Sequence, residues 1–260
     1  MKIALVSLNQ AWEDKEANLH VCEKYIKKAS DKEVDLIIFP EMTLTGFSNN
    51  TSLTAEDYEN SQTIDKFSNL AKKLSINTIF GVVVKDNDKA LNSALFIDKN
   101  GQILGRYTKI HPFSFAAEDR FFNAGSTLST VEADSMKIGL SICYDLRFPE
   151  LYSAMAKECD MVINIANWPA KRVEHWNALL RARAIENQIF IAGINRTGRD
   201  GNGLEYVESS NIFNANGEML EFAELGDMKI YEISKNWTKE FKDKFNTTND
   251  RKIEFYKEIL

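Results

Sequence analysis

The sequence has few of the residues that mark several common classes of protein. Its 260 residues include only three cysteines, Cys22, Cys143 and Cys159, and only four prolines. An odd number of cysteines without Cys-x-x-Cys spacing predicts neither a disulfide framework nor a zinc site, so no metal is expected. No linker and no internal repeat divides the chain. We therefore expect one domain over residues 1–260, with its core at about 2–233 and a helical extension at about 234–260.

An excess of positive charge and a long apolar run are also missing. The 32 basic and 38 acidic residues give a formal net charge of −6, which repels phosphate backbones and anionic lipid. No apolar run approaches the roughly 18 residues of a membrane span, and the N-terminal stretch becomes polar after about eight residues. We expect a cytoplasmic protein with no nucleic-acid or membrane partner.

Short apolar runs alternate with amphipathic stretches along the whole chain. The run at 34–39, VDLIIF, is nearly continuous, as in a strand that is covered on both faces. The apolar runs predict strands at 3–8, 34–39, 77–84, 91–97, 103–107, 137–142, 161–166, 189–194, 207–213, 217–222 and 228–233. The amphipathic stretches predict helices at 14–28, 64–74, 149–157, 173–188 and 237–245. This mixture predicts an α/β fold with mixed sheets and helices packed outside them.

Cys143 is the first residue that could carry chemistry. It ends the apolar run 137–142 and precedes a segment in which Pro149 suits the first turn of a helix. A cysteine at such a strand-to-helix turn is exposed to substrate beside free backbone N–H groups, and the helix N-terminus favours its thiolate. A buried, inert thiol is the common alternative for a lone cysteine, and Cys22 and Cys159 fit that alternative better.

Charged residues follow three other predicted elements. Glu41 comes directly after Ile-Ile-Phe-Pro, where a partly desolvated carboxylate could act as a general base. Lys109 follows the predicted strand 103–107 and could supply a fixed positive charge. Glu118 lies in an aromatic stretch that we expect to be a loop. Taken singly, a turn carboxylate or a surface lysine remains an equally good or better interpretation of each.

A histidine base for Cys143 is not indicated by the pattern. The chain contains only His20, His111 and His175, and the first of these lies on an early, surface-like helix. His111 and His175 stay open as candidates, because both lie in polar surroundings. A base other than histidine is therefore considered as well.

Together these segments resemble the nitrilase superfamily of carbon–nitrogen hydrolases. Phe39–Met42 resembles its glutamate motif, Tyr107–His111 its lysine motif and Ile142–Glu150 its cysteine motif. The likeness runs from residue 2 to about 233. The segment from Asn167 to Gly203 is most similar to the branch of bacterial omega-amidases, which hydrolyse 2-oxoglutaramate or 2-oxosuccinamate.

The resemblance implies a fold and a set of roles. The fold is a four-layer α-β-β-α sandwich with two mixed sheets, which pairs into a homodimer or a higher homo-oligomer. Glu41 is the base, Cys143 the nucleophile and Lys109 the cation that holds the oxyanion together with the backbone N–H of Tyr144. Glu118 holds Lys109, and no cofactor is required.

A small carboxylate-bearing amide would need a cation and a pocket wall. Arg147 and Arg172 are candidates for the cation, with Lys171 a weaker one, and Trp168 and Tyr144 are candidates for the wall. Arg181, Arg183 and Glu186, on the long helix, are expected to form ion pairs instead.

Three alternative functions stay open at this point. The first is another activity of the same superfamily, such as that of a carbamoylase, a nitrilase or an aliphatic amidase. The second is a metal-dependent phosphohydrolase, which also carries a glutamate after a strand but needs further Asp, Asn and His residues at strand ends. The third is a non-catalytic binding protein on the same fold.

Overall fold

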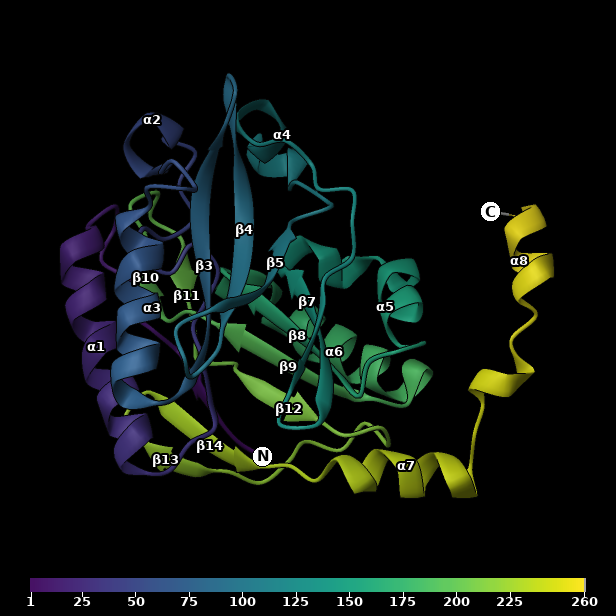
Figure 1. Ribbon diagram of the computed structural model, residues 1–260. Coiled ribbons are helices and arrows are strands. Elements are labelled where there is room, and N and C mark those ends of the chain that lie inside the picture. The colour runs from purple at the N-terminus through teal and green to yellow at the C-terminus, as the bar shows by residue number, and fades with distance from the viewer. Residues whose placement is uncertain (260) are drawn as a thin grey trace.

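The computed structural model describes residues 1–259 and contains two mixed sheets packed face to face (Figure 1). The first sheet has seven strands in the order β13-β14-β1-β2-β3-β4-β5, and the second has five in the order β12-β9-β8-β7-β6. Within the first, β1 pairs in parallel with β2 and antiparallel with β14. Helices α1 and α3 cover the seven-stranded sheet, and α5 and α6 cover the five-stranded one. The expected four-layer α-β-β-α sandwich is confirmed.

The elements have the following bounds. The strands are β1 Lys2–Val6, β2 Leu36–Ile38, β3 Asn77–Asp86, β4 Lys89–Ile97, β5 Ile103–Thr108, β6 Thr130–Ala133, β7 Met136–Ile142, β8 Met161–Ala166, β9 Phe190–Asn195, β10 Gly198–Arg199, β11 Glu205–Tyr206, β12 Asn211–Phe213, β13 Ala223–Leu225 and β14 Met228–Glu232. The helices are α1 Lys15–Asp31, α2 Thr51–Thr54, α3 Gln62–Leu74, α4 Glu118–Phe121, α5 Pro149–Met155, α6 Val173–Asn187, α7 Lys235–Lys244 and α8 Ile253–Ile259.

Alternation along β1 explains why two cores form. Successive side chains of a strand point to opposite faces of the sheet. Ile3 and Leu5 therefore enter the core between the two sheets, together with residues of β7 and β8. Ala4 and Val6 enter the separate core beneath α1 and α3. Burial on both faces accounts for the nearly unbroken apolar runs in the sequence.

Two expected strands differ from the structure. The strand predicted at 207–213 is limited to β12, because Ser210 N–H donates to the Glu208 side chain instead of to a neighbouring strand. The strand predicted at 217–222 is absent within the described residues, apart from one bridge between Phe213 and Met219. This segment leaves β12 in the second sheet and crosses to β13 in the first.

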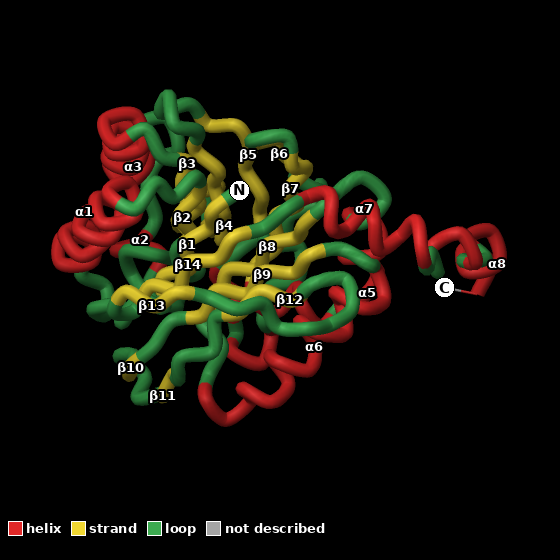
Figure 2. The backbone as a smooth tube through the Cα atoms, turned by 90° about the horizontal axis from the view of Figure 1, so that it is seen from below, coloured by secondary structure: helices red, strands yellow, loops and turns green. Residues whose placement is uncertain are grey.

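The C-terminal segment lies at the edge of the sandwich. Helix α7 runs below the sheets, and α8 stands apart from the rest of the chain in both views (Figures 1 and 2). Trp237 of α7 lies 5.7 Å from the ring of Phe190 in β9, so α7 remains attached to the second sheet. None of the described helices is both long enough and apolar enough to cross a bilayer.

Glu56 joins α1 to the start of α3. Its carboxylate accepts hydrogen bonds from Lys15 Nζ at 2.7 Å, Ser61 Oγ at 2.6 Å and Thr63 N at 3.0 Å. Burial alone would raise the pKa of Glu56, but these hydrogen bonds lower it to about 2. A carboxyl whose folded pKa lies below its unfolded value stabilises the fold above the unfolded value and loses that contribution as the pH falls.

We therefore expect Glu56→Gln to lower the free energy of unfolding by about 1–3 kcal/mol at pH 7. The difference from the unchanged protein should shrink as the pH falls from about 4.5 towards about 2. Urea unfolding at a series of pH values measures it. The exposed Glu59, changed to Gln, is the control and should leave stability nearly unchanged. A gap that stays constant down to pH 3 would contradict the assignment.

Candidate active site

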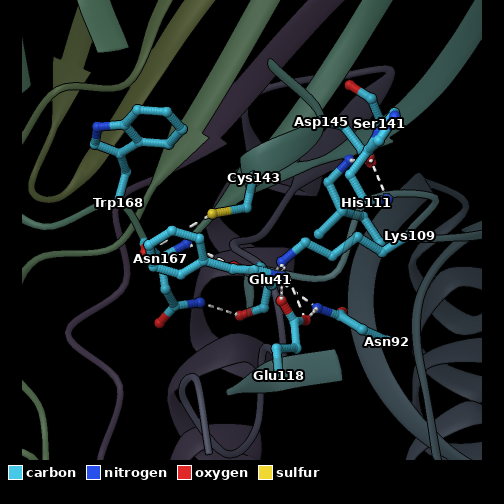
Figure 3. Close-up of polar contacts among 12 residues, drawn as sticks. Glu41, Asn92, Lys109, His111, Glu118, Ser141, Cys143, Asp145, Asn167 and Trp168 are labelled. Atoms are coloured by element: carbon cyan, nitrogen blue, oxygen red, sulfur yellow. Dashed lines mark hydrogen bonds and ion pairs between the residues drawn. The ribbon is translucent and has the colours of Figure 1, made fainter. Parts of the chain in front are cut away.

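Three strand ends deliver charged or nucleophilic side chains to one buried point between the sheets (Figure 3). Glu41 follows β2 after two residues, and Lys109 follows β5 directly. Cys143 follows β7 in the other sheet. The side chains of Glu41 and Lys109 are at most 1% exposed, and Cys143 is 8% exposed. The site is therefore assembled across the two sheets.

The turn at Cys143 is backbone-strained and held by one aspartate. Cys143 has a φ of 47°, in the left-handed region that a non-glycine residue rarely adopts. The buried Asp145 accepts the N–H of Ile142 at 3.0 Å and the hydroxyl of Tyr107 at 2.8 Å. The strain thus lies at the residue that carries the sulfur, and backbone strain of this kind clusters at functional sites.

The histidines have other contacts. His111 Nδ1 lies 2.7 Å from Asp145 Oδ1, and His175 Nδ1 lies 3.3 Å from a guanidinium nitrogen of Arg147. His20 is exposed on α1. Among the described residues, the hydrogen bond of the Cys143 thiol goes to the Asn167 carbonyl, at 3.9 Å, and not to a histidine.

Lys109 is held between two carboxylates. Its Nζ donates to Glu41 Oε1 at 3.0 Å and to Glu118 at 3.1 and 2.8 Å. Burial alone would lower the pKa of Lys109, but the charges of Glu118 and Glu41 raise it well above its usual range. The lysine is therefore an ammonium at every working pH. Glu118 begins the short helix α4, so the expected loop is corrected to a helical turn.

The pKa of the Cys143 thiol is raised well above its ordinary value. Burial is the main cause, and the carboxylate of Glu41 adds to it, while Lys109 opposes the shift. The two glutamates and one lysine already leave one negative charge, so a resting thiolate would add a second. The thiol is therefore neutral until a base takes its proton. Burial also raises the pKa of Cys159, to about 11, and that cysteine lies away from the cluster.

The loop that carries Glu41 is fixed by buried amides. Gln10 Nε2 donates to the carbonyls of Glu41 at 3.0 Å and Met42 at 2.9 Å, and Asn167 Nδ2 donates to that of Glu41 at 2.7 Å. Asn167 N–H also donates to Glu41 Oε2 at 2.9 Å. Gly81 of β3 packs directly against this loop. A Cβ at position 81 would lie 2.3 Å from the Met42 nitrogen.

We expect Gly81→Ala to displace Glu41, because the clash is with backbone and not with a flexible side chain. Activity should fall about tenfold or more, and the free energy of unfolding by about 1–3 kcal/mol. Hydrolysis of an amide, the reaction that the resemblance in the sequence leads us to expect, and urea unfolding measure the two effects. Gly139→Ala is the control, since its Cβ would meet only side chains, at 3.0–3.2 Å. It should lose some stability and keep its activity; equal losses of activity would contradict the role of Gly81.

A cavity of about 60 Å³ opens above Cys143 and Lys109. It is several times the about 10–15 Å³ that one water needs, so it suits a small molecule. Its wall is mainly aromatic and apolar, with two arginines. It is lined by Phe47, Lys109, Phe113, Ala116, Cys143, Tyr144, Arg147, Asn167, Trp168, Pro169, Arg172, Leu204 and Tyr206.

The cavity wall includes four residues that the sequence singled out for substrate contact. Tyr144 and Trp168 flank Arg147, whose guanidinium lies 4.9 Å from the Trp168 ring. Arg172 lies 5.5 Å from the Phe113 ring. In the described part of the chain, no carboxylate lies within 4.0 Å of either guanidinium. Two uncompensated cations in an apolar wall make the cavity suitable for an anion.

The other cations suggested by the sequence lie elsewhere. Lys171 is exposed and lies outside the cavity wall. Arg183 forms the expected ion pair with Glu186, at 3.0 Å, and also donates to the Leu146 carbonyl. Arg181 instead lies over the Phe213 ring at 5.6 Å. Within residues 1–259, no group of three or more His, Cys, Asp or Glu is arranged to hold a metal ion.

Sequence reasoning missed Asn92 and Gln10. Asn92 Nδ2 donates to both Glu41 and Glu118, and Gln10 holds the Glu41 loop. A signal for Asn92 was present, because it is a polar residue within the apolar stretch 90–97. For Gln10, which follows β1 in a loop, the sequence carried no comparable signal.

Comparisons with known proteins cover nearly the whole chain. A family model described as carbon-nitrogen hydrolase matches residues 2–236. Omega-amidase YafV of Escherichia coli (strain K12) is 34% identical over 257 residues, which cover 96% of each chain. 2-Oxoglutaramate amidase of Bacillus subtilis (strain 168) is 36% identical over 207 residues, which cover 78% of each. The crystal structure of XC1258 from Xanthomonas campestris, a CN-hydrolase superfamily protein with an arsenic adduct in its active site, is 30% identical with a TM-score of 0.89. It covers 96% of this chain and 97% of its own.

Proposed function

The chain belongs to the carbon–nitrogen hydrolase family of the nitrilase superfamily, and we propose that it is an omega-amidase. Membership of this family makes it an amidohydrolase that acts on C–N bonds other than peptide bonds. The favoured substrates are 2-oxoglutaramate and 2-oxosuccinamate, from which it releases ammonia. The observation that carries this substrate class is the pair of uncompensated guanidiniums, Arg147 and Arg172, in the wall of the cavity above Cys143. The omega-amidase and 2-oxoglutaramate amidase among its relatives support it.

The proposed reaction begins with proton transfer from Cys143 to Glu41. The sulfur then attacks the amide carbon, and the developing oxyanion is held by the Lys109 ammonium and the backbone N–H of Tyr144. This N–H lies in the first turn after β7, where helical N–H groups lack partners in the chain. Each such donor contributes about 3–4 kcal/mol to lowering the barrier.

The second half of the reaction returns the site to its starting state. Glu41 gives its proton to the leaving nitrogen, and ammonia departs from a thioester on Cys143. Water then attacks the thioester while Glu41 takes a proton from it. The C–S bond breaks, the carboxylic acid product leaves, and the proton on Glu41 returns to the Cys143 sulfur. Glu118 keeps Lys109 charged and in place throughout, through its two hydrogen bonds to Nζ.

A substrate panel scored by ammonia release tests the proposal. We expect kcat/KM for 2-oxoglutaramate to exceed that for a neutral amide of equal length by about 10- to 100-fold, as for one charge-assisted contact. Preference for a nitrile or a carbamoyl compound would instead assign a nitrilase or a carbamoylase. Loss of activity in EDTA would favour a metal-dependent hydrolase, and no activity on any member of the panel would favour a binding protein.

We expect Arg147→Met to raise KM for 2-oxoglutaramate about 10- to 100-fold, because it removes a cation that would bind the substrate carboxylate. Of the two guanidiniums, that of Arg147 lies closer to an aromatic ring, Trp168, which fixes its position. The neutral amide should be hydrolysed at an unchanged rate. Arg172→Met is the matched variant, since Arg172 lies in the same wall. If only Arg172→Met raises KM, the carboxylate contact belongs to Arg172; if neither does, the anionic substrate class is wrong.

The wall residues also bear on the size of the substrate. Phe113, Trp168 and Tyr206 surround the cavity with rigid rings, and the cavity volume is about 60 Å³. A substrate with a long or branched chain beyond the amide would have to displace these rings.

We further propose that the protein acts as a homodimer or a higher homo-oligomer, which size-exclusion chromatography would test.

A further inference from the structure

Asn92 donates to both glutamates of the site through one side-chain nitrogen. Nδ2 lies 2.7 Å from Glu41 Oε1 and 2.9 Å from Glu118 Oε1 (Figure 3). The reverse orientation of the amide would place an oxygen at those distances from two carboxylates, which is repulsive. The nitrogen therefore faces the glutamates, and its two hydrogens are both used.

Burying the Asn92 side chain where it lies would lower the stability of the fold if it did not form these hydrogen bonds. It is 1% exposed and shares its face of β4 with Ala90, Ala94 and Phe96, all of which are apolar and buried. Its Oδ1 is buried without a hydrogen-bond partner among the described residues. Burying an unpaired amide oxygen costs stability. In addition, the Asn92 backbone carbonyl accepts the Lys109 backbone N–H at 2.9 Å, so Asn92 is hydrogen-bonded to all three of these residues.

The hydrogen bonds distinguish the two carboxylates. Each carboxylate offers about four acceptor positions, two on each oxygen. All four positions of Glu118 are filled, by Asn92, by Lys109 twice and by Phe113 N–H at 2.5 Å. On Glu41, Asn92 and Lys109 fill Oε1, but Oε2 accepts only the Asn167 N–H. One acceptor position in the cluster stays open, and it lies on Oε2 of Glu41.

We propose that Asn92 is a positioning residue that makes Glu41 Oε2 the basic oxygen. This rests on the proposed function, in which Glu41 is the base. By filling the second position on Oε1, Asn92 leaves only Oε2 free to take a proton. The S–H bond of Cys143 then breaks as an O–H bond forms at Oε2, and the sulfur keeps the electron pair with which it attacks the amide carbon. Without Asn92 the carboxylate can turn and accept on either oxygen.

Two variants test this role through kcat, KM and the pH profile. Asn92→Ala should lower kcat about 10- to 100-fold, with KM changed less than about threefold. Its acid limb of kcat/KM should move to higher pH by about one unit, because the carboxylate has lost a donor. Asn92→Asp keeps the shape but replaces the donor by an acceptor. It should be less active than Asn92→Ala at pH 8 and regain activity relative to it at lower pH, where a protonated carboxyl can donate.

Alkylation of Cys143 by iodoacetamide provides a readout that needs no substrate. The acid limb of its rate should move in Asn92→Ala by the same amount as that of kcat/KM. If the unchanged protein releases no ammonia from any amide, the proposed function fails, and this reaction still decides the role of Asn92. The control is Asn77→Ala, a buried asparagine of β3 that contacts Asp35 and Asp134 away from the cavity. It should lose stability alone.

Three results would overturn the proposal. One is an unchanged kcat in Asn92→Ala or in Asn92→Asp. Another is a lowered kcat with both acid limbs unmoved, which would assign Asn92 a structural role only. The third is an equal loss in Asn77→Ala. If Asn92→Ala does not fold, the comparison of Asn92→Asp with the unchanged protein, by both readouts, decides in its place.

Discussion

Cys143→Ala is expected to reduce kcat for amide hydrolysis by roughly 10⁵-fold or more, to background. The reason is that no other nucleophile among the described residues lies at the floor of the cavity beside Lys109. Binding should survive, since the cavity wall and its two arginines are untouched. Ammonia release measures the loss, and calorimetry with 2-oxoglutaramate measures the retained affinity.

A matched control comes from the other thiols. Cys159→Ala removes a buried cysteine next to β8, outside the cavity, and should keep full activity. In the unchanged protein, mass spectrometry after rapid acid quenching should detect an acyl adduct on Cys143 and none on Cys159 or Cys22. Full activity in Cys143→Ala would exclude a covalent mechanism at this residue.

The second large effect is expected for Glu41→Gln, with kcat lowered about 10²- to 10⁴-fold and KM little changed. The amide has the shape of the carboxylate but cannot take the thiol proton. Lys109 keeps its partner Glu118 at 2.8 Å, so the buried ammonium stays paired. Lys109→Met would be less informative, because it leaves two buried carboxylates without their cation and endangers folding.

Steady-state kinetics with circular dichroism separates chemistry from folding in this variant. Glu56→Gln serves as control, since it removes a hydrogen-bonded carboxylate outside the cavity wall and should lower stability without lowering kcat. If Glu41→Gln retains activity within about tenfold, a different group takes the thiol proton, and the proposed roles of both Glu41 and Asn92 fail.

Much of the fold was predictable because its signals are local. The runs at 34–39, 137–142 and 161–166 are rich in apolar residues, and they form β2, β7 and β8, inside the sandwich. The turn at 98–101 was predictable from Asp-Lys-Asn-Gly, and it joins β4 to β5 with Gly101 at a φ of 82°. The crossing from β12 to β13 was not predictable, because the choice of sheet depends on long-range pairing.

Some features of the site were likewise predictable from local sequence, and others were not. Glu41, Lys109 and Cys143 could be singled out because each follows an apolar run, and a charge or thiol at a strand end is a local feature. That they converge depends on β7 packing in a different sheet from β2 and β5, which no local pattern contains. The short helix at Glu118 has four residues, too few for a periodic signal. The only sequence signal for Asn92 was that it is a polar residue within an apolar strand.

The placement of Cys143 after a strand of one sheet and of Glu41 and Lys109 after strands of the other has a consequence for the folding of the protein. A chain in which one sheet has formed and the other has not holds every residue of the site but no working site. A sliding of one sheet over the other by about 1 Å would already separate the reacting atoms from their productive distance. The rate of turnover therefore depends on the relative position of the two sheets. During refolding, activity should return only with the final docking of the sheets, later than the recovery of secondary structure.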